Sequence, residues 1–515
     1  MPDSALPIAF NPAGIELDPK KGLSRQLYQA LRERVLDGRL SGGARLPASR
    51  DLAAALGISR NSVVRAYDQL YAEGFIEGRI GNGTYVVQLP QKAQAPKKLS
   101  TNLSTGFSTG LPTGLSTKSS FLPVITSSKV IHSTALHKVS RHSLDQPPSG
   151  PPRAFRVGIP AFDLFPLEVW SKLQATFWRK PDLQQLCYGD PAGDERLRGL
   201  IAAYLRTSRG LSCSAEQILI TCGAQQGISL CAQLLVELGE GVAVENPGYH
   251  AAAQAFAIAG AQVLGVPVDQ EGMKCDALAG LPTCRLAYVT PSHQYPSGVT
   301  MSLARRLELL AWAERTQGWI VEDDYDGEYR YSGAPLSPLA ALDRTGRVIY
   351  VGTFGKVAFP ALRLGYLVLP HALIEPFAQR RSLDMRHSEV STQAVMAEFM
   401  AAGHFQRHIR RMRRAALSRR NALLAHWPKG VEGVGELPDI VAGLHVTVPV
   451  SSLEREHVLL AQAHQAQVEI NGLSRYWLRD SVEPVDNRAG LVLGFAGVPE
   501  ADIRAALARL SKVWR

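Results

Sequence analysis

Apolar residues in the first ninety positions recur at helical spacing. One stripe of a first helix, which ends near Gly38, is formed by Leu23, Leu27, Leu31 and Val35. Ser49 and Ser59 each precede a further apolar helical pattern, and serine at such a position predicts an N-cap. The segment FIEGRIGNGTYVV then predicts two short strands joined by a glycine-rich turn. Three helices followed by a hairpin predict a winged helix-turn-helix domain over residues 20–88.

The third helix of this predicted domain opens with polar residues, as a DNA-reading helix does. A helix fits the major groove of double-stranded DNA, and the residues near its N-terminus reach the base edges. Any one of the arginines could be an ordinary surface charge, but the ordered set favours a DNA interface. We therefore predict contacts with bases, phosphates or a groove edge from Arg45, Ser49, Arg50, Arg60, Asn61, Ser62, Arg65 and Arg79.

From about residue 153 onward, strand-type and helix-type segments alternate. The apolar runs QILITCG, GVAVEN, RLAYVTP, WIVEDDY and RVIYVGTF predict strands, and helical patterns lie between several of them. This alternation predicts an α/β domain over residues 153–515 with a largely parallel sheet. Ligands of such sheets bind beyond the carboxyl ends of the strands, so functional residues are expected directly after these runs.

Three polar clusters follow the predicted strands. The turn at Ala224 and Gln225 opens a helix whose N–H groups favour a phosphate, although small residues are also common in plain strand–helix turns. Asp323 and its acidic neighbour end an apolar strand and suit a metal, a helix cap or a cationic ring nitrogen. Lys356 follows a buried strand. Such a lysine either extends to solvent or, with a lowered pKa, forms a Schiff base with an aldehyde cofactor.

Residues 89–152 differ from both flanking segments. They are rich in Ser, Thr, Pro, Gly and Lys and have no usable period, which predicts a flexible basic linker. The chain of 515 residues carries a net charge of +10, of which +6 lies between residues 91 and 150. The linker would therefore either add sequence-independent contact with DNA or act as a spacer extended by like charge.

Composition argues against several other classes of protein. The 6 cysteines include no Cys-x-x-Cys pair, so we expect reduced thiols and no metal site. No stretch approaches the roughly 18 apolar residues of a membrane helix, and the N-terminus lacks the pattern of a secretion signal. These features favour a cytoplasmic protein without membrane contact.

Two sets of motifs resemble known families. The segment GGARLPASRDLAAALGISRNSVVRAYDQLYAEGFIEGRIGNGTYV resembles the winged helix of GntR-type bacterial regulators. The motifs YGDPAGDERLR, ENPGY, TPSHQYPSG, VEDDYDGEYRY and GTFGK resemble, in order, those of fold type I aminotransferases. Their fusion resembles the MocR subfamily of GntR regulators. The resemblance implies an α/β fold class in which a winged helix-turn-helix is joined by a long linker to a fold type I aminotransferase-like domain.

The resemblance also implies a site for pyridoxal 5'-phosphate. Lys356 would form the internal aldimine, and Asp323 rather than Asp324 would pair with the protonated pyridine nitrogen. Tyr325 would hydrogen-bond the ring hydroxyl, and Tyr249 would stack on the ring. The phosphate would be held by Ala224, Gln225, Thr353 and Arg363.

Two departures from the aminotransferase pattern affect the expected function. The usual Asn-Pro-x-Gly motif reads YPSG here, so a cofactor hydrogen bond would come from His293 or Gln294. The arginine by which aminotransferases bind a substrate carboxylate is replaced by Val492, with Arg475 or Arg479 as candidate substitutes. Full transamination is therefore not the expected activity.

The leading hypothesis is a regulator that binds an operator and senses pyridoxal phosphate or an amino compound through Lys356. The alternative is an active aminotransferase acting on an amino acid, and a third hypothesis is a DNA-binding protein whose large domain merely dimerises. Fold type I sites lie at a dimer interface, so the resemblance implies a homodimer. Two-fold symmetry would call for paired half-sites in the operator.

Neutralising the linker distinguishes its two interpretations. If the lysines between residues 91 and 150 are replaced by glutamine, the salt dependence of DNA affinity should become shallower, because fewer counterions are released. The slope of log Kd against log salt concentration measures this effect. A variant with the same number of linker threonines changed to glutamine is the control. An unchanged slope in the lysine variant would leave only the interpretation of the linker as a spacer.

Overall fold

The computed structural model describes residues 12, 14–19, 22–79, 83–88, 150–281, 283–332, 336–478, 484 and 486–514. The linker predicted over 89–152 lies outside these ranges except for residues 150–152, and so does the turn of the wing at 80–82. The described residues within 1–90 and 144–515 belong to one compact unit.

The N-terminal domain is a winged helix. It consists of α1 (Leu23–Leu36), β1 (Arg45–Leu46), α2 (Ser49–Leu56), α3 (Arg60–Ala72), β2 (Ile76–Arg79) and β3 (Gly83–Val86). The strands form an antiparallel sheet in the order β1-β3-β2. Leu27 and Leu31 of α1 are fully buried with Val63 and Leu70 of α3, which is why the predicted apolar stripe forms a helix.

The two predicted N-caps differ in outcome. The hydroxyl of Ser59 accepts a hydrogen bond from the backbone N–H of Ser62 at 3.2 Å, so the cap of α3 is confirmed. The prediction for Ser49 was wrong by one residue. The backbone of Ala48 is extended (φ −61°, ψ 149°) and Ser49 is already helical, so Ala48 holds the cap position without a side-chain hydrogen bond.

The large domain is built on an eight-stranded sheet, and the predicted α/β architecture is confirmed. Its strands β10, β9, β8, β5 and β6 are parallel neighbours, whereas β11 and β7 are antiparallel to the strands beside them. In sheet order the strands are β4 (Ile218–Thr221), β11 (Gly365–Val368), β10 (Val348–Thr353), β9 (Trp319–Asp324), β8 (Cys284–Val289), β5 (Gly241–Asn246), β6 (Gln262–Asp269) and β7 (Gly272–Met273).

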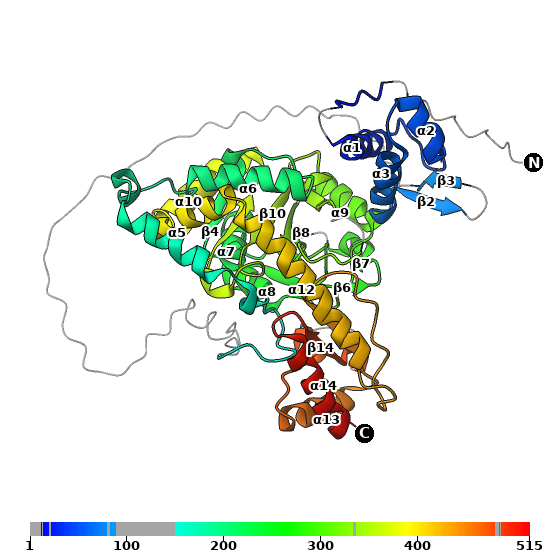
Figure 1. Ribbon diagram of the computed structural model, residues 1–515, viewed down its shortest axis with the longest axis vertical. Coiled ribbons are helices and arrows are strands. Elements are labelled where there is room, and N and C mark those ends of the chain that lie inside the picture. The colour runs from blue at the N-terminus through cyan, green and yellow to red at the C-terminus, as the bar shows by residue number, and fades with distance from the viewer. Residues whose placement is uncertain are drawn as a thin grey trace, which may run out of the picture. The chain divides into compact units, whose positions relative to one another are not determined.

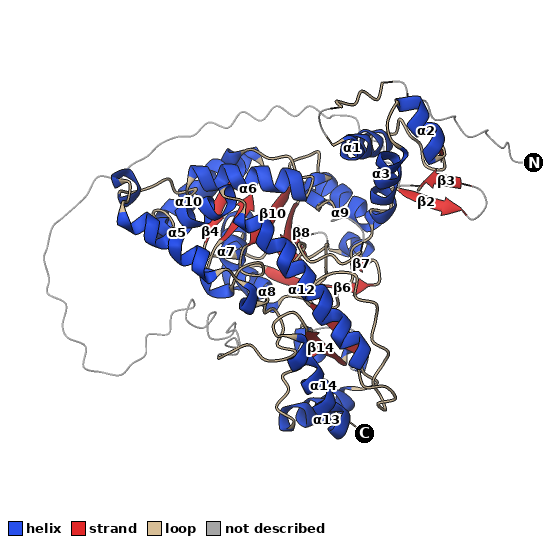
Figure 2. Ribbon diagram, in the orientation of Figure 1, coloured by secondary structure: helices blue, strands red, loops and turns tan. Residues whose placement is uncertain are grey.

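Helices cover both faces of this sheet, as the blue helices around the red strands in Figure 2 show. Successive strand residues point to opposite faces. Ile349 and Val351 therefore pack with Phe256 of α8 and Phe377 of α10, whereas Val348 packs on the side of α9. Helix α7 packs on the same face as α8. The bounds of these helices are α7 (Ala224–Leu235), α8 (His250–Ala259), α9 (Leu303–Thr316) and α10 (Ile374–Met385).

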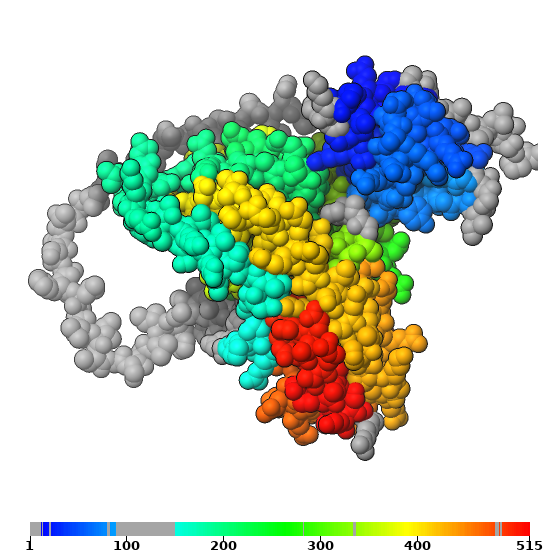
Figure 3. All heavy atoms as spheres, viewed as in Figure 1, coloured from blue at the N-terminus to red at the C-terminus, as the bar shows by residue number. Residues whose placement is uncertain are grey.

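A C-terminal lobe completes the domain. It contains a small antiparallel sheet of β12 (His445–Pro449), β14 (Gly490–Gly494) and β13 (Asn471–Gly472). Figure 1 shows the long helix α12 running from the large sheet toward β14, and Figure 3 shows the lobe's orange and red segments packed together. The remaining helices are α5 (Leu167–Arg179), α6 (Glu195–Ser208), α11 (Val390–Ala401), α12 (His404–His426), α13 (Leu453–Gln465) and α14 (Glu500–Val513).

Two further observations bear on the sequence-based expectations. All six cysteines are free thiols. Among the helices of the described ranges, none combines the length and the apolar character that crossing a membrane requires.

Candidate functional site

A cavity lies at the carboxyl ends of β4, β9 and β10, where residues that are far apart in the sequence meet. It is lined by eight of the nine residues predicted to hold a cofactor: Ala224, Gln225, Tyr249, Asp323, Tyr325, Thr353, Lys356 and Arg363. The ninth, His293, is not among the residues that line it. The parallel strands explain this arrangement, because their carboxyl ends lie at the same edge of the sheet.

One end of the cavity is suited to an oxyanion. Helix α7 begins there at Ala224, and the guanidinium of Arg363 lies beside its first turn, donating to the carbonyl of Cys222 at 2.8 Å. Gly223 adopts a φ of +78°, and a Cβ at this position would lie 3.3 Å from the Arg363 guanidinium. A glycine is therefore needed for the arginine to approach the N-terminus of the helix. The helix N–H groups and the guanidinium provide donors and positive potential.

Asp323 provides a buried carboxylate in the same cavity. Its Oδ2 accepts a hydrogen bond from the hydroxyl of Tyr288 on β8 at 2.7 Å, whereas its Oδ1 is buried without a hydrogen-bond partner. Burial raises the pKa of Asp323 to about 7, although the Tyr288 hydroxyl and Lys356 oppose the rise. An unpaired buried oxygen calls for a donor from a ligand, and a protonated ring nitrogen is such a donor.

The neighbouring Asp324 points away from the cavity. Its Oδ2 accepts from the Tyr350 hydroxyl at 2.6 Å and lies 3.1 Å from Nε of the buried Arg209. The alternation of side chains along β9 therefore assigns Asp323 to the cavity and Asp324 to an internal ion pair.

Lys356 lies directly after β10 and faces the acid. Its Nζ donates to the carbonyl of Gly158 at 2.8 Å, and a Cβ on Gly158 would lie only 2.9 Å from this nitrogen. Burial lowers the pKa of Lys356 below its usual range, and Asp326 and Asp323 oppose the change. A lowered pKa increases the fraction of neutral amine, which is the form that attacks an aldehyde carbon.

His293 and Gln294 are held away from the position expected of a cofactor ligand. Nδ1 of His293 lies 3.1 Å from the Tyr325 hydroxyl and 3.0 Å from Oδ2 of Asp326. The amide of Gln294 donates to Glu245 at 3.2 Å and to the Pro247 carbonyl at 2.9 Å. His293 therefore contacts the phenol that lines the cavity, and Gln294 braces the loop behind it.

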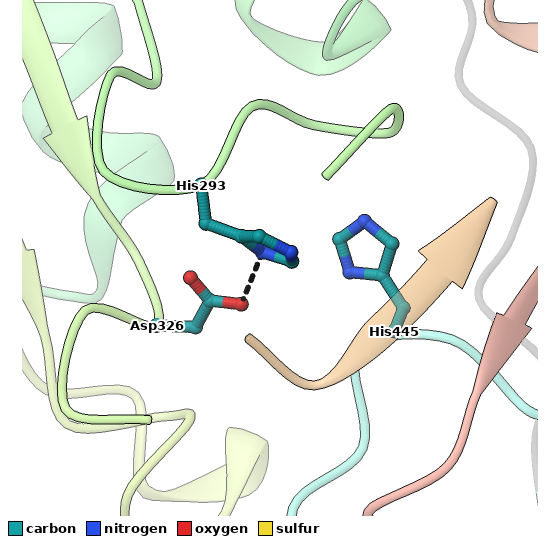
Figure 4. Close-up of side chains that lie close together, drawn as sticks. All are labelled: His293, Asp326 and His445. Atoms are coloured by element: carbon teal, nitrogen blue, oxygen red, sulfur yellow. Dashed lines mark hydrogen bonds and ion pairs between the residues drawn. The ribbon is translucent and has the colours of Figure 1, made fainter. Parts of the chain in front are cut away.

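Tyr288 and His445 are among the cavity residues that sequence reasoning missed. Tyr288 lies within the predicted strand RLAYVTP, where a tyrosine is also an ordinary core residue. His445 comes from β12 in the C-terminal lobe, and its ring lies 4.7 Å from that of His293, with Asp326 beside them (Figure 4). No local signal marks His445, because only the fold brings it to the cavity.

The position expected to hold a carboxylate-binding arginine contains Val492, fully buried in β14 and paired with Asn471 and Thr447. Of the two candidate substitutes, Arg475 hydrogen-bonds Asn471 at 3.4 Å and lies over the ring of Tyr476. Arg479 lies outside the described residues.

The residues predicted to contact DNA lie on several elements of the winged helix. Arg60, Asn61 and Arg65 are exposed on the N-terminal half of α3. Ser62 is partly buried, with its hydroxyl 2.9 Å from that of Ser59. Arg79 ends β2, where it is paired with Glu77. Exposed Arg45 and Arg50 lie on β1 and α2, with partly buried Ser49.

The cavity as a whole fits pyridoxal phosphate. Its polar groups match three functional groups of that molecule: a cradle for the phosphate, a carboxylate for the ring nitrogen and an amine for the aldehyde. The Oδ1 atom of Asp323 carries this fit, since no donor within the described part of the chain satisfies it.

Comparison with known proteins gives the same two parts. Residues 23–86 match the model of bacterial regulatory proteins of the gntR family, and residues 159–437 match that of aminotransferases of class I and II. The chain is 34% identical to the probable rhizopine catabolism regulatory protein MocR of Rhizobium meliloti, over 96% of this chain and 94% of that protein. It is 31% identical to the pyridoxine biosynthesis regulator PdxR of Corynebacterium glutamicum, over 98% of both chains.

Solved structures resemble the large domain. The kynurenine aminotransferase of Pyrococcus horikoshii superposes with a TM-score of 0.62 at 28% identity, covering 75% of this chain and 95% of that one. A mixed α/β aminotransferase fold with a pyridoxal phosphate site thus follows a GntR-type winged helix. The chain therefore belongs to the GntR-type transcription regulators of the MocR kind, whose aminotransferase-like domain takes pyridoxal phosphate as its cofactor.

Proposed function

We propose that this regulator binds operator DNA through its winged helix and that pyridoxal phosphate, or an amino compound that reacts with it, changes that binding. One observation carries the proposal: the cavity holds the full set of groups for the cofactor, whereas β14 has Val492 where aminotransferases have a substrate-binding arginine. The site is thus equipped to hold a ligand rather than to turn over amino acids. Since the DNA it binds lies in the cytoplasm, we assign the protein to that compartment.

Each residue of the cavity has a distinct part in binding. Asp323 would pair with the protonated ring nitrogen, Tyr325 would hydrogen-bond the ring hydroxyl, and Tyr249 would stack on the ring; all three line the cavity. Arg363, Thr353 and the first turn of α7 would hold the phosphate. When bound, pyridoxal phosphate supplies an aldehyde that condenses reversibly with primary amines, including the amine of Lys356.

A ligand can change DNA affinity only if it binds two states of the protein differently. The effect on DNA binding equals the difference in its binding free energy between those states. The proposed domains are residues 20–88 for DNA, 89–152 as a linker, and 153–515 for the cofactor. The ligand's effect must therefore reach the winged helix through a change in the large domain.

We further propose that the protein acts as a homodimer on paired half-sites. Large apolar residues are exposed on α5 and the following turn, and Tyr188 is 88% exposed. Of these residues, Trp178, Leu186 and Tyr188 line a groove together with His387, and exposed apolar patches of this kind mark protein interfaces. The exposed set is Leu167, Trp178, Leu183, Leu186 and Tyr188.

The alternative function is an active aminotransferase acting on an amino acid. The likeness to class I and II aminotransferases favours it, and the valine at position 492 opposes it. Sustained turnover of an amino acid with a keto acid, on the order of 1 per second or faster, would establish this alternative.

Borohydride reduction tests the covalent attachment of the cofactor. Protein loaded with pyridoxal phosphate should be yellow, and reduction should fix the cofactor on the peptide that contains Lys356, because only an imine is reduced to a stable amine. Peptide mass spectrometry measures the product. Lys356→Ala should give no labelled peptide, whereas Lys172→Ala, an exposed lysine on α5, should label normally. A colourless protein that takes up no added cofactor would contradict the proposed function.

The hydroxyl of Tyr288 should set the pH dependence of cofactor binding. Asp323 is neutral below its pKa of about 7 and ionised above it, so binding of the protonated ring nitrogen should strengthen as pH rises through that value. In Tyr288→Phe the carboxylate loses a hydrogen bond, and the midpoint should move upward by about one pH unit.

Absorption titrations of the cofactor-free protein at several pH values measure this midpoint. Tyr350→Phe is the matched control, because that hydroxyl donates to Asp324 instead. Superimposable pH profiles for Tyr288→Phe and the unaltered protein would show that this hydrogen bond does not tune Asp323.

Removing a recognition-helix arginine should affect DNA but not the cofactor. Arg65→Ala should weaken operator binding about tenfold, because one arginine contact with a base contributes about 1–3 kcal/mol. Arg39→Ala removes an exposed arginine that is paired with Asp37 outside α3, and it should bind as the unaltered protein does. Gel-shift titrations give the affinities. A changed cofactor spectrum in Arg65→Ala would contradict the assignment of α3 to DNA alone.

A further inference from the structure

The cavity has an aromatic wall made of Tyr249, Tyr295, Tyr325 and His445, all of which line it. The ring of Tyr295 lies 5.9 Å from those of Tyr249 and Tyr325 and 5.3 Å from that of His445, in edge-to-face geometry. Burial raises the pKa of the phenols of Tyr295 and Tyr325 well above the usual value, so these side chains remain neutral. The proposed function assigns Tyr249 and Tyr325 to the cofactor. The proposed function assigns no role to Tyr295 or His445.

His445 presents a hydrogen-bond acceptor in this wall. Its Nε2 lies 3.0 Å from the carbonyl oxygen of Pro296, and a carbonyl can only accept, so Nε2 carries the proton. Burial lowers the pKa of His445 to about 3, which keeps the ring neutral. Nδ1 therefore has a free lone pair at neutral pH and can accept from a hydroxyl or an amine.

Arg363 and Arg475 lie near Tyr249 and Tyr295 of the wall, whereas the charged groups near His445 are Asp326 and Lys356. Asp326 lies beside the histidine pair, with its Oδ2 3.0 Å from His293 Nδ1, and it also accepts from the backbone N–H of Leu444 at 3.2 Å (Figure 4). Asp323 is the second carboxylate, and Lys356 is the cation that faces them. Once the amine of Lys356 is bonded to the cofactor, this side of the cavity offers acceptors and aromatic faces, which attract ammonium and hydroxyl groups and repel a second carboxylate.

We propose that the aromatic wall selects, as effectors, primary amines whose other polar groups are hydroxyls, and discriminates against amino acids. This inference rests on the proposed function, because the effector must reach the cofactor bonded to Lys356. The effector nitrogen forms the bond to the aldehyde carbon as the bond to Lys356 Nζ breaks. The two protons that the effector ammonium loses are taken up by Lys356 Nζ, so no other reactant is required. The remaining hydroxyl donates to His445 Nδ1.

Pairs of amines that differ only in carrying a hydroxyl or a carboxylate test the proposal. The cofactor-loaded protein is titrated with 3-aminopropan-1-ol and with 3-aminopropanoate, and then with 5-aminopentan-1-ol and with 5-aminopentanoate. The half-saturating concentration is measured from the change in cofactor absorption at constant pH and ionic strength. Each amino alcohol should half-saturate at a concentration at least tenfold lower than that of its acid partner. Equal or tighter binding of the acids overturns the proposal.

Variants of His445 test the acceptor. His445→Phe keeps an aromatic ring in the wall but removes Nδ1, and it should reduce the preference for the amino alcohol to less than threefold. His445→Gln restores an acceptor and a donor for Pro296, and it should recover part of the preference. His371→Phe makes the same substitution at an exposed histidine outside the cavity and should leave the preference intact. A full preference in His445→Phe overturns the role of this residue.

The outcomes separate this inference from the proposed function. If borohydride still traps the cofactor on Lys356 but neither kind of amine changes its absorption, the effector inference is overturned and pyridoxal phosphate itself remains the ligand. If no cofactor is trapped, the proposed function fails first. Because the amine pairs are compared on the unaltered protein, the principal test does not depend on whether a variant folds.

Discussion

The site depends on one buried carboxylate, that of Asp323. A carboxylate that is removed from water loses a large hydration energy, so its charged form is disfavoured unless donors replace the water. Among the described residues, Tyr288 supplies one donor and the second oxygen has no partner. A cationic ring nitrogen would satisfy that oxygen, which would link the stability of the charged acid to the presence of the cofactor. The parallel sheet makes this possible, because β8, β9 and β10 bring Tyr288, Asp323 and Lys356 to neighbouring positions.

The same geometry explains how a catalytic type of site can serve as a sensor. The oxyanion cradle, the buried acid and the lysine bind a cofactor whether or not a reaction follows. Catalysis on an amino acid also requires the substrate to be held by its carboxylate, and Val492 contributes nothing to that contact. In the effector site that we propose, the aromatic wall with His445 offers neutral surfaces and acceptors instead. The proposed function therefore requires the site to bind a ligand without orienting it for turnover.

Much of this arrangement could be predicted from local sequence. Apolar runs followed by Gly, Asp or Lys predicted where strands end at the carboxyl edge of a parallel sheet. Ala224, Asp323 and Lys356, which follow or end such runs, all line the cavity. The choice between Asp323 and Asp324 followed from the alternation of side chains along a strand. The cap at Ser49 was misplaced by one residue, since an extended backbone at Ala48 is not visible in the residue types.

Sequence reasoning missed His445 because only tertiary structure brings it to the cavity. His445 is the first residue of β12, and its contact with His293 depends on how the C-terminal lobe packs against the large sheet.

The central claim is that the cofactor bound at Lys356 alters DNA binding. Its most direct test is the affinity of one protein preparation for the DNA upstream of its own gene, measured with and without pyridoxal phosphate, and compared with Lys356→Ala. The account predicts a change in Kd for the unaltered protein, with an equal reciprocal change in cofactor affinity on adding DNA, and no change for the variant. Identical values of Kd with and without cofactor in the unaltered protein would contradict it.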